Sequence, residues 1–264
     1  MQKVSRDGVA LAYEERGQGS PPLLFVHGWS CDYRYFAPQV EHFSRDHRTI
    51  AVDLRGHGAS DAPHQEYTMS AFADDLAWLC NQLGVEKPVV VGHSMGAVVA
   101  LQLAAEHPDV PSAIVMIDGG TRTLVPPPPG GDPSLLLADV MRNADDLTPV
   151  RRAIDGMFLP TDDPERRAWI TEAMLSTHRH VIASAWEQLR KVDGKSAAQA
   201  CSVPALFINA ATWRPELERL RELCPHVMLG QTVGAGHFNM LEVPDQVNAM
   251  LSRFLELNAA AIAR

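Results

Sequence analysis

The five residues Gly92-His93-Ser94-Met95-Gly96 constrain the fold of this chain more than any other segment. The apolar run 88–92 before the serine predicts a short buried strand, and the run 95–106 after it predicts a helix. A serine between two glycines on such a strand-to-helix turn is the pattern of a nucleophile elbow. Side chains at positions 92 and 96 would collide with the strand or the helix, and the turn strains the backbone of Ser94. Ser94 is therefore a candidate nucleophile that faces the N-terminus of the following helix.

Short apolar segments alternate with helical patterns on both sides of this turn. The strand patterns cover residues 9–16, 22–27, 48–52, 88–92, 112–117, 203–209 and 227–233. The helical patterns among them cover residues 33–43, 68–83, 95–106 and 244–257. This alternation predicts an α/β protein with a mostly parallel sheet and helices on both of its faces.

The alternation stops after the strand that ends at Ile117. Pro126 to Pro129, followed by two glycines, can form neither a helix nor a central strand. The helical patterns that follow cover residues 133–143, 148–158, 164–177 and 179–191. We therefore expect a core domain of residues 1–120 and 199–264, with a helical cap of residues 121–198 inserted after the sixth strand. Such an insertion would lie over the carboxyl edge of the sheet, where ligands bind in these folds.

Composition excludes several classes of partner. The chain has 264 residues, of which 46% are hydrophobic and 21% charged, and its net charge is −9. A nucleic acid or an anionic membrane surface would require a basic face, so neither is expected as a partner. No stretch approaches the roughly 18 apolar residues that span a bilayer, and the N-terminal residues lack the apolar run of a signal peptide.

The cysteines indicate a reducing compartment. The four cysteines are scattered and show neither a CxxC motif nor metal-finger spacing. We interpret them as free thiols and expect a cytoplasmic protein that uses no metal and no cofactor. The expected partner is a small molecule, and the sequence leaves the oligomeric state open.

Four motifs carry a resemblance to a known superfamily. They are His27-Gly28-Trp29 after the third strand, the run from Asp53 to Ser60 after the fourth, Gly92 to Gly96, and Gly234-Ala-Gly-His-Phe near the C-terminus. In this order and together they resemble the α/β-hydrolase fold with a helical cap, as in serine hydrolases of the carboxylesterase type. The fold hosts many chemistries, so the motifs are much more specific for the fold than for the substrate.

The resemblance implies a role for each motif. Ser94 would be the nucleophile and His237 the general base, and the backbone N–H groups of Trp29 and Met95 would form an oxyanion hole. His237 also stands out by itself, because it lies in a glycine-rich loop after a strand. The indole of Trp29 would line the acyl pocket or simply pack in the core.

Other residues of these motifs are expected to be structural. We expect this for His27, His57 and His93, and we expect Asp53 and Arg55 to satisfy backbone groups.

The third member of the triad departs from the family pattern. Relatives usually place an acid after the seventh strand, but here Thr212 or Trp213 stands at that place. Asp118 ends the sixth strand, next to the elbow strand, and could reach His237 to fix its tautomer. Alternatively, Asp118 only caps its turn and Glu216, the first acid after the seventh strand, orients the histidine.

These residues predict an ester hydrolase that works through an acyl-enzyme on Ser94. The apolar cap residues Met141, Met157, Phe158, Leu159, Trp169, Met174 and Trp186 would partly line its pocket. No clustered pair of arginines is evident, which favours uncharged, moderately hydrophobic esters. The alternatives are a C–C bond hydrolase of aromatic catabolism, a cofactor-free oxygenase of N-heterocycles, and a catalytically silent binding protein.

Overall fold

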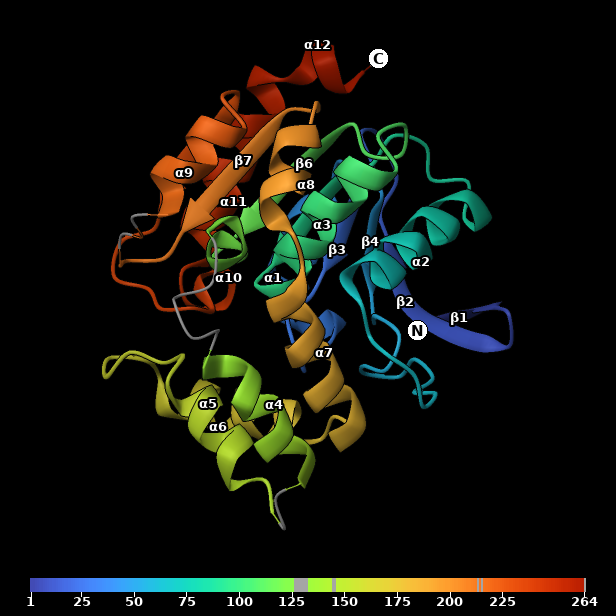
Figure 1. Cartoon of the computed structure of the whole chain (residues 1–264). Coiled ribbons are helices and arrows are strands. Elements are labelled where there is room, and N and C mark those ends of the chain that lie inside the picture. Colours follow the sequence, from blue (N-terminus) through green and yellow to red (C-terminus); the bar gives the residue numbers. More distant parts are fainter. Residues whose placement is uncertain (126–132, 144–145, 213, 215, 264) are drawn as a thin grey trace.

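The central element is one twisted sheet of eight strands. The computed structural model describes residues 1–125, 133–143, 146–212, 214 and 216–263. Its strands run in the order β1-β2-β4-β3-β5-β6-β7-β8 (Figure 1). The pairs β1–β2 and β2–β4 are antiparallel, and all the others are parallel. The strands are Gln2–Arg6, Val9–Arg16, Leu23–Val26, Thr49–Val52, Val89–His93, Ala113–Ile117, Ala205–Asn209 and Val227–Gln231, numbered β1 to β8 in this order.

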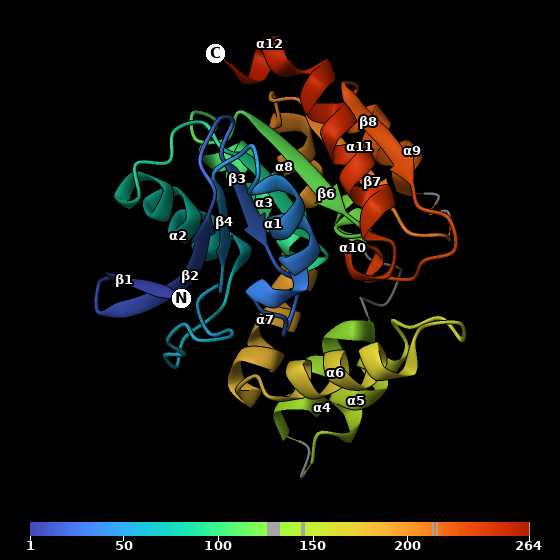
Figure 2. The same cartoon turned by 180° about the vertical axis from the view of Figure 1, so that it is seen from behind.

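Helices cover both faces of the sheet, as expected for a parallel sheet whose central strands are entirely apolar. One face carries α2 (Met69–Gln82), α3 (Met95–Glu106), α8 (Gly194–Ala200) and α9 (Glu216–Leu223) (Figure 1). The other face carries α1 (Ala37–Phe43) and α11 (Pro244–Leu257) (Figure 2). Every residue of β3, β5 and β6 is buried between these layers.

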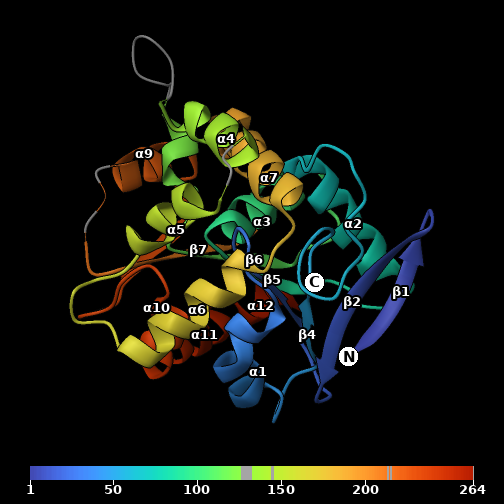
Figure 3. The same ribbon diagram turned by 90° about the horizontal axis from the view of Figure 1, so that it is seen from below.

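Between β6 and β7 the described residues form helices joined by turns and contain no strand. It contains the 3₁₀-helix η2 (Thr121–Leu124) and then α4 (Pro133–Asn143), α5 (Thr148–Asp155), α6 (Pro164–Leu175), α7 (Arg179–Lys191) and α8. Seen from below in Figure 3, α4 to α7 lie over one edge of the sheet. The predicted boundary at residues 198 and 199 falls within α8, which packs against α3. The predicted proline and glycine break at 126–131 lies outside the described residues.

The register of the parallel strands places their carboxyl ends together under these helices. Val26 of β3 pairs with Gly92 of β5, and His93 of β5 pairs with Ile117 of β6. Ile117 in turn pairs with Ile208 of β7. Residues that directly follow these four strands therefore meet at one edge, which is where the sequence motifs lie.

The sequence missed several peripheral elements. The first is β1, which pairs with β2 across a turn at Asp7 and Gly8, both with positive φ. The short helices α10 (Asn239–Glu242) and α12 (Ala259–Ile262) were also not expected, nor was α8. None of the helices in the described part of the chain has the length and apolar character needed to cross a membrane.

Arg55 has a different role from the predicted one. The expectation was that it satisfies backbone groups, but its guanidinium instead binds the buried carboxylate of Asp75, with Nε 2.7 Å from Oδ2. Arg6 of β1 binds the same carboxylate at 3.0 Å. The buried charge of Asp75 therefore requires two arginines. Asp53 behaves as predicted, because it accepts hydrogen bonds from the backbone amides of Tyr33 and Ala59.

The tight contact at the turn after β5 provides a test of the fold. A Cβ added to Gly92 would overlap the carbonyl group of Gly96, and a Cβ on Gly96 would overlap the backbone of β3 at Val26. Both obstacles are backbone, so neither can move aside cheaply. We expect Gly92→Ala to lower the melting temperature by about 5 °C or more, since strain of this kind costs at least about 1–3 kcal/mol.

Gly156→Ala is the matched control for this prediction. Gly156 has φ −69°, and the nearest atom to an added Cβ is the carbonyl oxygen of Ala153 at 3.5 Å, an ordinary contact. Thermal unfolding of both variants checks the prediction. Equal melting temperatures for Gly92→Ala and wild type would contradict it.

Candidate active site

Ser94 lies on the tight turn between β5 and α3 in an uncommon conformation. Its φ of 53° and ψ of −113° lie outside the regions that non-glycine residues usually adopt. Its amide donates to the carbonyl group of Ile117 at 2.9 Å, which fixes the turn to the end of β6. This geometry lifts the hydroxyl group above the sheet edge, in front of the first turn of α3.

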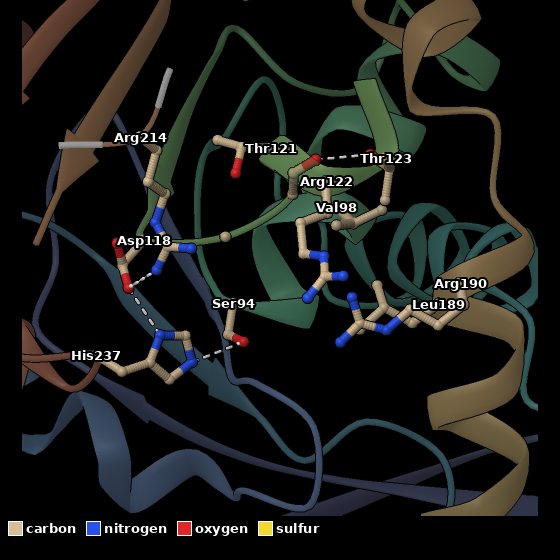
Figure 4. Close-up of a pocket in the computed structure, with 12 residues that line it drawn as sticks. Ser94, Val98, Asp118, Thr121, Arg122, Thr123, Leu189, Arg190, Arg214 and His237 are labelled. Carbon is tan, nitrogen blue, oxygen red and sulfur yellow. Dashed lines mark hydrogen bonds and ion pairs between the residues drawn. The ribbon is translucent and has the colours of Figure 1, made fainter. Parts of the chain in front are cut away.

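His237 and Asp118 join Ser94 in one hydrogen-bonded chain (Figure 4). Nε2 of His237 lies 2.9 Å from the Ser94 hydroxyl oxygen, and Nδ1 lies 2.7 Å from Oδ2 of Asp118. An ionised carboxylate only accepts, so Nδ1 carries the proton and Nε2 is free to accept from the serine. The structure thus brings together the three residues that the sequence singled out. Asp118, and not Glu216 at the start of α9, is the partner of His237.

Asp118 is held as a carboxylate by several donors. It follows β6 with φ 41° and is fully buried as a side chain. Besides His237, the amide of Ala210 binds its Oδ1 at 3.1 Å, and the Arg214 guanidinium binds its Oδ2 at 3.0 Å. Burial acts most strongly and opposes ionisation, but His237, Arg214 and the Ala210 amide outweigh it and lower the pKa of Asp118 to about 2. The carboxylate is therefore charged at neutral pH.

The backbone amides of Trp29 and Met95, the predicted oxyanion-hole donors, lie in the loop after β3 and at the start of α3. Met95 is the first residue of α3, so its N–H has no acceptor within the helix. Neither amide donates a hydrogen bond to another group within the described chain. The loop of Trp29 lies close to the serine, because a Cβ added to Gly28 would approach the Cβ of Ser94 to 3.1 Å. Both N–H groups are thus available to a ligand beside Ser94.

The buried histidines near the site hold backbone groups. The amide of Leu54 donates to Nε2 of His27, and Nδ1 of His27 donates to the carbonyl group of Gly28. Nε2 of His93 lies 2.8 Å from the carbonyl oxygen of His237. Burial, the largest influence, lowers the pKa of both His57 and His93 to about 3, so both rings are neutral. These contacts agree with the structural roles predicted for the three histidines.

A cavity of about 490 Å³ opens above Ser94 and His237. Four of the apolar residues expected to line a pocket do so, namely Met157, Phe158, Leu159 and Trp186. Met141 and Met174 are instead buried in the helical segment, and Trp169 packs against Tyr35 with ring centroids 5.0 Å apart. The indole of Trp29 both lines the cavity and packs, since its Nε1 donates to the carbonyl group of Ile182. Both interpretations of Trp29 therefore hold.

Three arginines also line this cavity, which corrects the expectation that no arginines cluster. They are Arg122 of η2, Arg190 of α7 and Arg214 before α9 (Figure 4). No sequence pattern indicated the cluster, because the three residues lie far apart along the chain and follow no motif. The fold brings them together around the cavity. The preference for an uncharged substrate, which was inferred from the lack of such a cluster, is therefore no longer supported.

Glu242 of α10 is a site residue that the sequence analysis missed. Its carboxylate accepts from the amides of Gly236 at 2.7 Å and Phe238 at 3.2 Å, so it fixes both neighbours of His237. Burial and the adjacent Asp162 raise the pKa of Glu242. The spacing of Glu242 five residues after His237 gave a weak signal at most.

Two groups of possible metal ligands occur in the described chain, and neither is part of this cavity. The first consists of Cys201, Cys224 and His226, and the second of Asp74, Glu106 and His107. In the first group, Nε2 of His226 already binds the carbonyl group of Val203 at 2.8 Å. All four cysteines are free and buried.

The pair Asp162 and Glu242 leads to a pH-dependent prediction. The raised pKa of Glu242 means that its ionised form is disfavoured in the folded protein, so stability falls as the pH rises through this pKa. We expect Asp162→Asn to remove the like charge and to increase the free energy of unfolding at pH 7.5 by about 1 kcal/mol, which raises the melting temperature. The gain should shrink as the pH falls below the pKa of Glu242.

Thermal unfolding between pH 4 and pH 8 measures this effect. Asp155→Asn, which removes an exposed charge of the same segment, serves as the control and should show no such trend. A gain for Asp162→Asn that is the same at all pH values would count against the interaction.

Comparisons with known proteins agree with the fold. Residues 21–147 match the family model described as alpha/beta hydrolase fold. The AB hydrolase superfamily protein YisY of Bacillus subtilis is 27% identical over 260 residues, which cover 95% of this chain and 97% of YisY.

Two solved structures share the whole fold. The enol-lactonase of Burkholderia xenovorans superposes with a TM-score of 0.86 at 24% identity, over 97% of this chain and 100% of that one. A thermophilic esterase of Thermogutta terrifontis gives a TM-score of 0.85 at 27% identity, over 97% and 98% of the two chains. The chain therefore has the α/β-hydrolase fold, and hydrolases are among the proteins it is similar to.

Proposed function

We propose that the protein is a serine hydrolase that cleaves carboxylic esters through an acyl-enzyme on Ser94. The observation that carries this proposal is the continuous chain from the Ser94 hydroxyl group through His237 to Asp118, with contacts of 2.9 and 2.7 Å. A serine hydroxyl group is a weak nucleophile until a base within hydrogen-bond distance takes its proton. Here the base is present and its tautomer is fixed.

In the first half of the reaction Ser94 attacks the ester carbonyl carbon. The new C–O bond forms while Nε2 of His237 takes the hydroxyl proton, and the carbonyl electron pair moves onto oxygen. The N–H groups of Trp29 and Met95 would stabilise this oxyanion, and each such donor is worth about 3–4 kcal/mol in serine enzymes. Asp118 stabilises the imidazolium without accepting its proton.

In the second half the tetrahedral intermediate collapses. The bond to the alcohol oxygen breaks, and the leaving alcohol takes the proton from His237 Nε2. Water then enters, gives a proton to the same nitrogen and attacks the acyl carbon. Collapse of the second intermediate releases the acid and returns the proton to Ser94.

We further propose that residues 121–198 act as a cap that shapes the substrate pocket. Several hydrogen bonds join this segment to the loops of the sheet, among them Tyr35 to the Ile170 carbonyl group at 3.2 Å and Tyr67 N–H to the Ser184 hydroxyl group at 3.0 Å. The segment also supplies most of the apolar lining of the cavity, including Phe158 and Trp186. Substrate range would therefore depend on this segment.

The names of two similar proteins support ester chemistry. The Thermogutta terrifontis protein, 27% identical, is an esterase, and the more distant Burkholderia xenovorans protein acts on an enol-lactone, a cyclic ester. The C–C hydrolase and oxygenase alternatives would use the same His237 and Asp118. Ester hydrolysis and phosphonate labelling that depend on Ser94, tested next, separate the ester hydrolase from these alternatives.

Removal of the Ser94 hydroxyl group tests covalent catalysis. We expect Ser94→Ala to lose at least about a thousandfold in kcat on a panel of p-nitrophenyl esters and to lose labelling by a serine-reactive phosphonate. Ser112→Ala is the matched control, because Ser112 is buried directly before β6 and lines no part of the cavity. It should retain activity and labelling. Full ester hydrolysis by Ser94→Ala would refute the acyl-enzyme.

A comparison of the two candidate acids tests the third member of the triad. Asp118→Asn keeps the side-chain shape but cannot stabilise an imidazolium, and it can hold the wrong tautomer of His237. We expect a loss on the order of a thousandfold in kcat, while Glu216→Gln stays close to wild type. Melting temperatures show whether either variant has lost its fold. An active Asp118→Asn together with a crippled Glu216→Gln would overturn the assignment.

A further inference from the structure

The arginines of the cavity point to the charge of the substrate. Resting on the serine-hydrolase function proposed above, we propose that Arg122 and Arg190 form an anion subsite, and that the substrate is an ester whose acyl part carries a carboxylate. Such substrates are half-esters of dicarboxylic acids and related cyclic esters with a free carboxylate. The subsite would bind the far end of the acyl chain while Ser94 attacks its ester end.

The two arginines come from separate elements, and both line the two cavities that contain Ser94. Arg122 lies in η2 directly after β6, and Arg190 lies near the end of α7. Both line the cavity of about 490 Å³ and an adjoining one of about 110 Å³, and Ser94 and His237 line both cavities as well. Figure 4 shows both guanidinium groups directed into the space beside the Ser94 hydroxyl group.

Among the described residues that line the two cavities, arginines outnumber carboxylates. Asp118 is the one carboxylate among the described residues that line the two cavities, and Arg214 and His237 already bind it. Arg122 forms no ion pair within the described chain. The guanidinium of Arg190 lies 4.4 Å from the centroid of the Trp186 ring, which fixes its position. Two adjacent guanidinium groups in a partly enclosed space match the two oxygens of a carboxylate.

A neighbouring cavity that shares these two arginines is also basic. This third cavity, of about 740 Å³, is lined by Arg122 and Arg190 together with Lys191, Lys195 and Arg219, and the one carboxylate in its described lining is Asp193. Lys191 and Arg219 pair with Glu187 and Glu222, so part of this charge is compensated. Although the chain has a net charge of −9, this local excess of positive charge would attract an anion.

The position of His237 indicates which part of the ester is anionic. The leaving alcohol must lie at Nε2 of His237 to receive its proton. In Figure 4 the guanidinium groups of Arg122 and Arg190 lie across Ser94 from His237. A group bound there belongs to the acyl part, which stays on the serine when the alcohol leaves.

Matched pairs of esters test the subsite. The phenyl half-esters of adipic, pimelic and suberic acids carry a carboxylate, and the corresponding methyl phenyl diesters have the same length without the charge. We expect wild type to release phenol from at least one half-ester with a kcat/KM about tenfold or more above that of its diester. The preference should decline with added salt.

Variants show whether the two arginines cause this preference. Arg122→Gln and Arg190→Gln should each reduce the ratio of half-ester to diester about tenfold, and Arg122→Lys should retain part of it. Arg253→Gln, on the surface of α11 and outside all of these cavities, is the control and should leave the ratio unchanged. Calorimetry of pimelate binding to Ser94→Ala, with and without Arg122→Gln, gives a readout that does not depend on activity. Melting temperatures identify a variant that fails to fold. The glutamine variant that does fold then decides the test.

The outcomes separate the subsite from the proposed function. Phosphonate labelling of Ser94 and phenol release from the diesters, without any preference for the half-esters, would overturn the anion subsite alone. A preference that survives in both glutamine variants would also overturn it. Absence of labelling and of phenol release from both series would overturn the serine hydrolase and the subsite together.

Discussion

The close contact between β5 and α3 is the constraint on which the rest of the site depends. Gly92 and Gly96 allow the helix to start directly above the strand, where any side chain would overlap backbone. This contact holds Ser94 at a positive φ and leaves the amide of Met95 without an acceptor in its helix. Strain at one residue thus gives both a hydroxyl group that lines the cavity and a nearby N–H donor. The packing of α3 against β3, β5, β6, α2 and α8 supports this arrangement.

The parallel register then determines which residues can join Ser94. Because β5 and β6 end side by side, the residue after β6 lies next to the elbow, and this residue is Asp118. Its carboxylate links the end of β6 to the Ala210 amide after β7, to Arg214 and to His237. A single buried charge therefore connects the elbow strand, the neighbouring strands and the histidine loop. Arg214 binds the carboxylate of Asp118, and Glu242 binds the loop that carries His237.

The sequence predicted those parts of the molecule that local patterns encode. The glycines around Ser94, the apolar strands and the helices 95–106, 133–143, 179–191 and 244–257 follow from short-range sterics and periodicity, and the structure has these helices at those positions. Asp118 could be predicted because strand order places it beside the elbow. Strand β1 was missed although Asp7-Gly8 is a hairpin signal, since an exposed edge strand shows no clear alternation of burial.

Tertiary contacts without a local pattern could not be predicted. Arg55 was assigned to backbone groups because its true partner, Asp75, is distant in sequence. The cluster of Arg122, Arg190 and Arg214 depends in the same way on how the segment between β6 and β7 folds back over the sheet.

The acyl-enzyme on Ser94 is the central claim, and its direct observation is the most decisive measurement. Wild-type protein can be mixed with a p-nitrophenyl ester, quenched with acid within the first turnover, digested and examined by mass spectrometry. The mechanism predicts that the peptide containing Ser94 gains the mass of the acyl group, and that the same peptide stays unmodified in Ser94→Ala. Release of the acid product during that turnover without any acylated Ser94 would contradict the mechanism.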